Sequence, residues 1–414
     1  MKKLFIVVLV MGIVFGFLFA EGSSETQKEI EIHWASIWVG ADSKAEIMKT
    51  LVSEFNIANS GKYKVIVDEY PNYDAFRSNL NTQITTGQVP DIFALNWDAT
   101  TKEFYQGKIL MDFNKELTGD WGKDFVAGSI SEATIDSKTM SVPYEVAYTP
   151  IWYNMNILKA SGVSEIPSTY EAFFSACEKI KAAGFIPSSQ MTGGTNAWTS
   201  MLWYSHICAS LGGEDVWKKD FKTDPIFVQA AEILKKMYQN GNTSNDAVGG
   251  DAGVSGGHYL AGESACFING PWYIGRVRSD APEVYKATKA AFAPGTDGMI
   301  GFAQTNLAAA ATNDSNKKAG VLAFLKWLTK PENVARVTEA SGAMIAVKST
   351  SSDTVDPLLA QFNDLGSQAA FILPHFGQQV TTDVLAEFGQ ALAGMANGQL
   401  TSQEFVNQIA SVME

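Results

Sequence analysis

Tryptophan side chains stand beside hydroxyl, amide and carboxyl side chains at several points where an expected strand or turn gives way to a loop or helix. Trp38 follows Ser36 by two residues, Asn96-Trp97-Asp98 follows a short apolar run, and Trp272 follows Gly270-Pro271. Aromatic faces stack on C–H patches of a ligand, and amides and carboxylates bond its hydroxyl groups. This chemistry suits noncovalent capture of a polyhydroxylated solute such as a sugar.

Reactive and metal-binding patterns are missing from the sequence. There is no Gly-x-Ser-x-Gly elbow, and the four histidines (33, 206, 258, 375) show no zinc-ligand spacing. Cys177, Cys208 and Cys266 are widely spaced and odd in number, so buried free thiols are expected, with one bridge as the alternative. Gly249–Gly257 lacks the Gly-Lys-Ser/Thr of a phosphate loop and is expected to be a flexible loop. We therefore expect no catalysis, no cofactor and no metal.

The N-terminus has the three-part build of a secretory signal peptide. Lys2 and Lys3 precede an apolar run over residues 4–20, and a polar stretch follows Ala20. Cleavage after Ala20 is expected, which places the mature protein in the periplasm or another extracytoplasmic space. An uncleaved membrane anchor is the alternative, because seventeen residues reach the lower end of the spanning range of about 17–25.

Length and charge limit the remaining classes. A chain of 414 residues supports two or three domains, and its 46% hydrophobic content supplies an ordinary globular core. The net charge of −13 argues against nucleic acid as a partner, because phosphates require a basic surface. No segment after residue 20 reaches membrane-spanning length, so a soluble mature protein is expected.

The elements expected to position these side chains alternate between strands and helices. Strands are predicted near 30–35, 63–70, 91–95 and 142–148, with helices near 47–55 (Asp42 or Ser43 as N-cap) and 73–85. Further helices are predicted at 167–183, 197–211, 226–239, 317–328, 331–340, 378–396 and 401–413. The strand-helix-strand-helix-strand order of residues 30–95 predicts a mainly parallel sheet wrapped by helices, and ligands in such folds bind beyond the carboxyl ends of the strands.

Several short patterns resemble one protein family when they are taken together in order. They are Gly87-Gln88-Val89-Pro90-Asp91-Ile92, Gly107–Asp112, Val142-Pro143-Tyr144 with Trp152-Tyr153-Asn154, Ala261–Ala265 leading to Gly270-Pro271-Trp272, Ala323–Leu328, and Asn397–Thr401. Each is weak alone, but their order and spacing span about 30–414. The chain resembles the family 1 extracellular solute-binding proteins of ABC sugar importers, the group that includes the maltose-binding proteins.

The resemblance implies an α/β, two-lobed periplasmic-binding-protein fold (type II), in which each lobe is a sheet wrapped by helices. Three hinge crossings, near 144–148, 301–306 and 342–348, would join the lobes, which close on the ligand. Residues 30–143 plus 307–342 would form the N-terminal lobe, and 148–300 plus 349–414 the C-terminal lobe. The implied partners are a sugar and the permease subunits of an ABC transporter, and a monomer is expected.

The candidate ligand contacts follow from this placement. Trp272 is the first candidate, because the tryptophan at the matching position of the family stacks on sugar. The alternative is that Trp272 is buried and only packs against the start of its own helix. Trp38, Trp198 and Asp98 are weighed evenly against packing or capping roles. The family's sugar-binding glutamate falls on Ala147, and Glu145, two residues earlier on the same strand face, is its candidate replacement. The full set is Ser36, Trp38, Asn96, Trp97, Asp98, Glu145, Trp198, Trp272, Gln304 and Asn306.

Three alternative functions stay open at this point. An exported carbohydrate-active enzyme would need two carboxylates flanking a scissile bond. A polyamine, organic acid or metal chelate could replace the sugar in the same fold, since Asp98 and Glu145 do not exclude a cation. Binding could also serve a surface receptor instead of a transporter.

Overall fold

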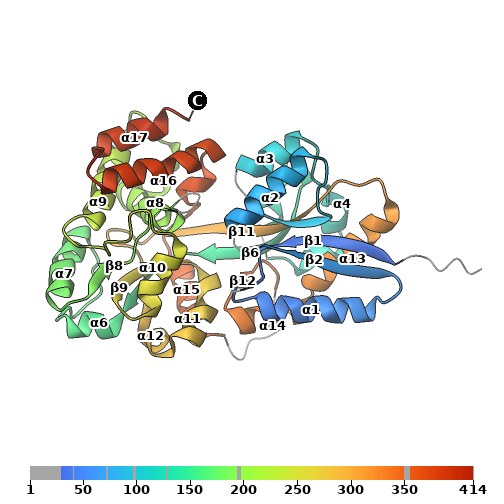
Figure 1. The fold of residues 1–414 in the computed structure, drawn as a ribbon, viewed down its shortest axis with the longest axis horizontal. Coiled ribbons are helices and arrows are strands. Elements are labelled where there is room, and N and C mark those ends of the chain that lie inside the picture. Colours follow the sequence, from blue (N-terminus) through green and yellow to red (C-terminus); the bar gives the residue numbers. More distant parts are fainter. Residues whose placement is uncertain are drawn as a thin grey trace, which may run out of the picture.

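The computed structural model describes residues 29–413 except 41, 71–72, 97–98, 127–128, 194–196 and 349–354. The chain forms two α/β lobes that stand side by side and are joined by long strands (Figure 1). This is the two-lobed arrangement that the sequence predicted.

The first lobe is built on a seven-stranded sheet. Its order is β12-β6-β11-β3-β1-β2, and β13 pairs with β11. The strands are β1 (Ile30–Ser36), β2 (Tyr63–Glu69), β3 (Ile92–Leu95), β6 (Val142–Tyr148), β11 (Met299–Ala309), β12 (Met344–Ile345) and β13 (Ile372–Leu373). The first three strands are parallel, whereas β11 runs antiparallel to β3 and to β6. The carboxyl ends of β1 and β3 therefore lie at the edge of the sheet from which β6 and β11 continue toward the second lobe (Figure 1).

Helices cover both faces of this sheet because their apolar residues recur every three or four positions. In α1, Met48, Leu51, Val52 and Phe55 are all buried. The elements are α1 (Ala45–Ala58), α2 (Tyr73–Thr85), α3 (Ala99–Gln106), α4 (Asn114–Leu117), η1 (Asp120–Asp124), α5 (Ser129–Glu132), α13 (Ser315–Leu328) and α14 (Pro331–Ser341), with a small hairpin of β4 (Thr134–Ile135) and β5 (Lys138–Thr139). Separate apolar clusters form around Trp34 and Phe324 and around Phe76 and Phe93.

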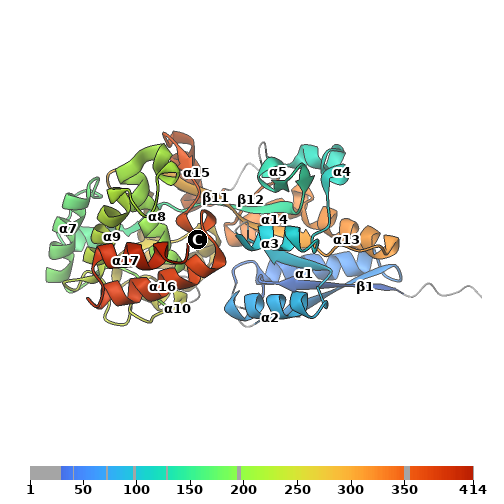
Figure 2. The same ribbon diagram turned by 90° about the horizontal axis from the view of Figure 1, so that it is seen from above.

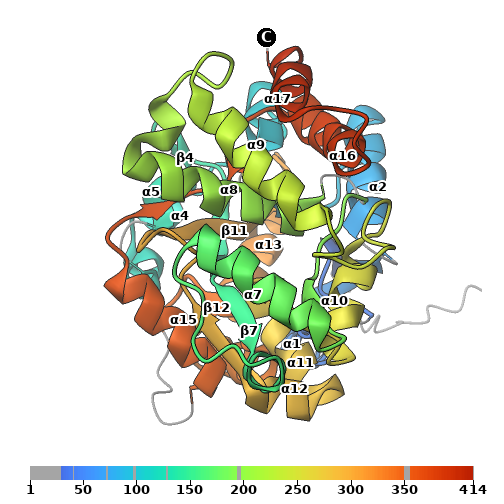
Figure 3. The ribbon, with the colours of Figure 1, turned by 90° about the vertical axis from the view of Figure 1, so that its left-hand side faces the viewer.

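The second lobe has a smaller sheet and more helices. Its sheet runs in the order β10-β7-β9-β8, from β7 (Ile151–Asn154), β8 (Ile186–Ser188), β9 (Ser264–Ile268) and β10 (Thr288–Ala291). Its helices are α6 (Met155–Ala160), α7 (Tyr170–Ala182), α8 (Trp198–Gly212), η2 (Gly213–Lys218), α9 (Pro225–Tyr238), α10 (Ala252–Leu260), η3 (Pro271–Tyr273), α11 (Ile274–Asp280), α12 (Pro282–Ala287), α15 (Pro357–Gln368), η4 (Phe376–Gln378), α16 (Thr382–Ala396) and α17 (Ser402–Ala410). Figure 3 shows this lobe from its outer side, where α7 and α9 flank α8. Helix α8 is apolar on nearly all sides and forms the centre of the core.

The lobes are joined by strands and by the packing of α11 against α14. Strand β6 leads directly into β7, and β11 spans the junction in the other direction (Figure 2). Below these strands, α11 of the second lobe lies against α14 of the first. An ideal Cβ on Gly275 would lie 2.7 Å from the carbonyl oxygen of Ser341, so only glycine permits this approach.

Most predicted elements are confirmed, and two local predictions are wrong. Gly249–Gly257 is not a flexible loop, because Ala252–Leu260 forms α10 with Asp251 accepting from the main-chain N–H groups of Gly253 and Val254. The N-cap of α1 is Lys44 and not Asp42 or Ser43, although Asp42 Oδ1 accepts from the Lys44 N–H at 2.8 Å. The three cysteines are free and buried, as predicted. Within the described residues, no helix has both the length and the apolarity needed to cross a membrane.

Candidate ligand-binding site

Two tryptophans of the second lobe form an aromatic pair. The rings of Trp198 and Trp272 lie 5.8 Å apart at an interplanar angle of 52°. Trp198 begins α8 directly after Ala197, which has a left-handed backbone (φ 46°), and Trp272 lies in η3 after Gly270 and Pro271. Both side chains are half-buried, which leaves part of each ring accessible. The structure thus brings together two candidates that are 74 positions apart in the chain.

Gly270 sets the position of the Trp272 ring. An ideal Cβ on Gly270 would lie 1.9 Å from Cζ3 of that indole, so the ring covers the Cα of the glycine. Any larger residue at position 270 would force the indole out of its present position. In the Gly-Pro-Trp sequence, the missing side chain of Gly270 therefore lets the Trp272 ring pack against the main chain two residues before it.

The aromatic pair touches the first lobe through Ser43. The Ser43 hydroxyl, just before α1, donates a 2.8 Å hydrogen bond to the main-chain carbonyl of Trp272. A second, longer contact joins the lobes elsewhere, where the Thr382 hydroxyl of α16 donates to Glu103 of α3 at 3.4 Å. Trp272 therefore lies at the junction of the lobes, beside the loop that follows β1.

A buried polar cluster joins that loop to Glu145 of β6. Trp38 is 2% exposed and donates its indole N–H to Glu145 Oε2 at 3.2 Å, while Lys44 Nζ lies 3.2 Å from Glu145 Oε1. Lys44 also pairs with Asp42 at 3.2 Å. Ser36 is fully buried and accepts the main-chain N–H of Trp38 at 3.1 Å. Ser36, Trp38 and Glu145 are thus brought together, but each bonds with its neighbours within the lobe.

Burial and charge act in opposite directions on this cluster. Burial by itself lowers the pKa of Lys44, but the carboxylates of Asp42 and Glu145 outweigh it and raise that pKa above the ordinary value. Burial raises the pKa of the Glu145 carboxyl in spite of the nearby Lys44 ammonium. Because both Glu145 oxygens already accept from Trp38 and Lys44, its carboxylate fixes the loop after β1 to the strand β6.

Three amide side chains lie near the same edge of the sheet. Asn96 follows β3, accepts from the Thr305 hydroxyl at 3.4 Å, and donates to the Tyr73 hydroxyl. Asn306 on β11 pairs with Leu95 and is 1% exposed, yet neither its Oδ1 nor its Nδ2 has a partner. The buried Oε1 of Gln304 also lacks one. Buried polar atoms of this kind are normally satisfied, so they indicate a place for a water or a ligand group.

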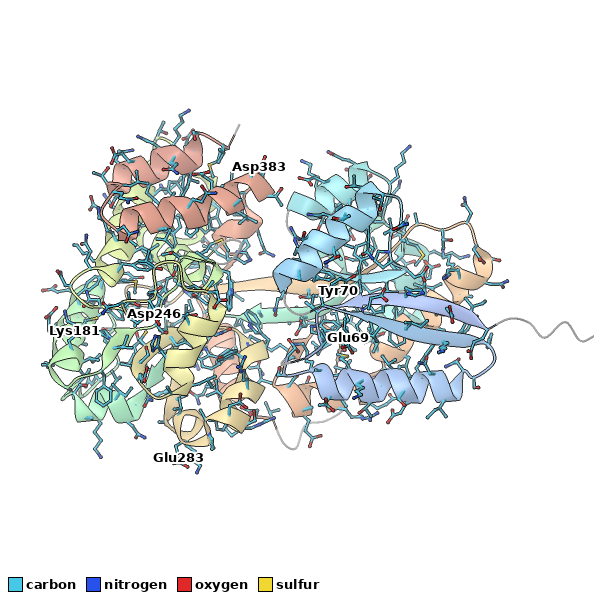
Figure 4. The ribbon with its side chains drawn as sticks, in the orientation of Figure 1. Glu69, Tyr70, Lys181, Asp246, Glu283 and Asp383 are labelled. Carbon is cyan, nitrogen blue, oxygen red and sulfur yellow. The ribbon has the colours of Figure 1, made fainter. Side chains whose placement is uncertain are left out.

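The sequence reasoning missed one aromatic residue at this edge. Tyr73 begins α2, is 37% exposed, and bonds Asn96 through its hydroxyl. Figure 4 shows Tyr70 and Glu69 at the nearby end of β2, which faces the other lobe. A tyrosine four positions after the last residue of a parallel strand was the available signal. The candidates Trp97 and Asp98 lie outside the described residues.

Metal chemistry finds no support in the part of the chain that the structure describes. No group of three or more His, Cys, Asp or Glu side chains could hold an ion there. His206 is buried and His375 is half-buried, and the loss of hydration lowers their pKa values to about 4 and about 3, so both imidazoles are neutral at physiological pH.

The sequence and the fold have matches among known proteins. The family described as "Bacterial extracellular solute-binding protein" matches residues 41–335. The chain belongs to this family. A "Probable sugar-binding periplasmic protein" of Mesorhizobium japonicum is 21% identical over 76% of this chain and 75% of its own length. The "Diacetylchitobiose binding protein DasA" of Streptomyces coelicolor is 23% identical over 75% of this chain and 72% of its own.

A solved structure confirms the fold of this solute-binding protein. A "Chitin oligosaccharide binding protein" superimposes with a TM-score of 0.85, covers 93% of this chain and 98% of its own, and is 19% identical. At that identity the likeness shows the fold alone. These relatives carry the names of binding proteins and not of enzymes.

Proposed function

We propose that this solute-binding protein captures an uncharged mono- or oligosaccharide in a cleft between its lobes and delivers it to the permease of an ABC transporter. The observation that carries the proposal is the half-buried Trp198–Trp272 pair at the junction of the lobes. Two indole faces that meet at 52° offer stacking surfaces to the C–H patches of a sugar ring.

The polar groups at the carboxyl ends of the first-lobe strands support a neutral ligand. Asn306 and Gln304 present amide atoms without partners, and amides can both donate to and accept from hydroxyl groups. Glu145, the buried carboxylate nearby, is occupied by Lys44 and Trp38. A polyamine would require carboxylates that are free to pair with its ammonium groups, so the described side chains favour a sugar.

The relatives suggest which sugars to try first. Two of the proteins reported above are named for diacetylchitobiose and for chitin oligosaccharides. Diacetylchitobiose is therefore the first probe, and maltotriose and raffinose test other linkages.

The lobe boundaries predicted from the sequence complete the proposal. Residues 30–143 with 307–342 would move as one body and 148–300 with 349–414 as the other, about crossings at 144–148, 301–306 and 342–348. The pairing of β6 with both β11 and β12 supports this assignment, because all three strands then lie at the hinge.

Export and mode of action belong to the same proposal. The protein would lose residues 1–20 on export, act outside the cytoplasmic membrane as a monomer, and catalyse no reaction on its ligand. N-terminal sequencing of the exported protein tests the cleavage, and Met1 in the mature chain would contradict it.

A thermal-shift screen tests the ligand class. A ligand that binds only the native state adds RT ln(1 + [L]/Kd) to stability, about 2.7 kcal/mol at 100 times Kd. We expect a shift with at least one of diacetylchitobiose, maltotriose or raffinose, and none with spermidine or putrescine. A shift with a polyamine and none with any sugar would overturn the ligand class.

Replacement of the central tryptophan is the matched test of the site. We predict that Trp272→Ala weakens binding of the sugar found in the screen about tenfold or more, since one stacking face contributes roughly 1–3 kcal/mol. Calorimetry measures the affinity, and Trp327→Phe on the outer side of the first lobe serves as control. Equal affinity of Trp272→Ala and the wild type would remove Trp272 from the site.

A further inference from the structure

The glycine-rich segment Gly249–Gly257 has no role in the site as described so far, yet it contacts η3, which carries Trp272, and the residues Thr192 and Gly193, which precede α8. The first contact is with the residues that lead to Trp198. The N–H of Gly193 donates to the carbonyl of Gly250 at 2.8 Å, and the N–H of Gly249 donates to the Thr192 hydroxyl at 2.8 Å. An ideal Cβ on Gly193 would lie 2.5 Å from the Gly249 carbonyl oxygen. The main chains of these two segments are therefore in direct contact.

The second contact is with the element that carries Trp272. Gly256 of α10 is buried against Tyr273, the residue after Trp272 in η3. An ideal Cβ on Gly256 would lie 2.3 Å from the Tyr273 hydroxyl oxygen and 3.0 Å from Cζ. The helix therefore accepts the tip of the tyrosine only because position 256 has no side chain.

The Tyr273 ring has little freedom to move aside. It packs 5.6 Å from the ring of Phe267 and 6.4 Å from that of Trp152, both fully buried, and the Arg276 guanidinium lies 5.8 Å from its centroid. A push on its hydroxyl is therefore passed to the main chain of η3, and Trp272 is part of that short helix.

We propose that segment Gly249–Gly257 is the positioning element of the aromatic pair, fixing Trp272 through Tyr273 and holding Thr192 and Gly193, which precede Trp198 in the chain. The role in ligand selectivity rests on the proposed function, because the spacing of the two rings would decide which sugar fits. The segment acts through the tryptophans and does not itself touch the ligand.

Adjacent glycines of α10 supply the test. Gly256→Ala and Gly257→Ala make the same chemical change in the same helix, but a Cβ on Gly257 meets nothing within 4 Å. In protein that carries 5-fluorotryptophan, the fluorine resonances of Trp198 and Trp272 are assigned by their loss in Trp198→Phe and Trp272→Phe. We expect Gly256→Ala to shift both resonances and Gly257→Ala to leave them in place. This measurement needs no ligand, so it stands even if the proposed function fails.

Ligand affinity and a compensating change complete the experiment. With diacetylchitobiose, or whichever sugar binds in the screen, Gly256→Ala should lose roughly fivefold or more in affinity, and Gly257→Ala less than about twofold. Adding Tyr273→Phe removes the oxygen nearest the new methyl group but leaves Cζ 3.0 Å from it, so it should move the resonances back toward the wild-type positions and restore part of the affinity. Resonances in Gly256→Ala that match those of Gly257→Ala would overturn the proposal. A loss that Tyr273→Phe does not reduce, including a loss of folding, would also overturn it.

Discussion

In the structure, Glu145 forms a buried ion pair with Lys44, although it was expected to contact the ligand. Its position on β6, two residues from the alanine that matches the family's sugar-binding glutamate, suggested a ligand contact. In the structure it is 2% exposed and pairs with Lys44, which is 1% exposed. Lys44 also begins α1, where a positive charge opposes the helix dipole. A lysine at such a place is stable only because Glu145 and Asp42 surround it.

The pair makes a prediction about stability. Removing one partner of a buried ion pair costs up to about 3–5 kcal/mol, because the remaining charge loses its main compensation: Lys44 keeps only Asp42, and Glu145 keeps only the Trp38 N–H. We expect Glu145→Gln and Lys44→Met each to lower the free energy of unfolding by roughly that amount. The double variant should recover part of the loss. Urea denaturation measures all three.

A control pair lies on the surface of the same lobe. Arg336 donates to both oxygens of Glu54 at 2.8 and 2.9 Å, but Glu54 is 40% exposed. Solvent screens such pairs, so Glu54→Gln should change the stability much less than Glu145→Gln does. Equal losses in the two variants, or strictly additive losses in the Lys44–Glu145 double variant, would contradict the interpretation of a coupled buried pair.

At the scale of elements, α10 shows why glycine content misled the sequence analysis. Three features make Ala252–Leu260 helical: Asp251 accepts from two main-chain N–H groups, Ser255 and Tyr259 pack inward, and Gly256 fits against Tyr273. The last is a contact with a residue 17 positions away, which composition does not report. Strands and amphipathic helices were predictable because their apolar spacing is local, as in α1 and α9.

The candidate site was predictable to a similar extent. The Trp198–Trp272 pair joined two candidates chosen separately, whereas the partners of Trp38 and Glu145 depend on Lys44, whose burial no local pattern indicates. Tyr73 was missed because its bond to Asn96 links the start of α2 to the residue after β3, which only the tertiary fold brings together.

Helix α10 also carries His258, whose ring lies between the carboxyl groups of Asp246 and Glu263; we call these three residues the His258 clamp, and we expect its stabilising effect to depend on pH. His258 Nδ1 lies 2.7 Å from Glu263 and its Nε2 lies 3.0 Å from Asp246, which Figure 4 places beside the helix. Partial burial by itself lowers the pKa of His258, but the hydrogen bonds and charges of Glu263 and Asp246 outweigh it and raise that pKa above 6.5. A raised folded-state pKa gives stabilisation that is complete below the unfolded-state value and is lost as the pH rises through the folded-state value.

The clamp is tested by comparing melting temperatures at two pH values. Wild type should melt above His258→Gln at about pH 5.5 by on the order of 1 °C, and the difference should shrink toward about pH 9. His33→Gln is the control, because His33 is 46% exposed and faces one carboxylate at 3.4 Å. A difference between wild type and His258→Gln that does not change with pH would exclude the clamp.

At the scale of the whole molecule, one side of the lobe junction depends on close packing of α11 against α14. Arg278 of α11 donates to the carbonyls of Glu339 and Ala340 at the end of α14, and to Asp356, which caps α15. Gly275 packs against the carbonyl group of Ser341. An ideal Cβ on Gly342 would lie 2.9 Å from the Cβ of Ile274, so the two helices are in close contact there as well. The same helix α11 follows Trp272, whose carbonyl accepts from Ser43. The packing of two helices is thereby linked to the position of the aromatic pair.

Gly275→Ala tests this link. The new methyl group would lie 2.7 Å from a carbonyl oxygen and not from a flexible side chain, so α11 and α14 must separate. Because the Ser43–Trp272 contact is on the same side of the junction, we expect the lobes to part there. The radius of gyration from X-ray scattering should increase, and sugar affinity should fall by about fivefold or more. Gly257→Ala, which adds a methyl group in open space, should change neither quantity. Scattering and affinity in Gly275→Ala equal to those of Gly257→Ala would show that closure does not depend on this helix contact.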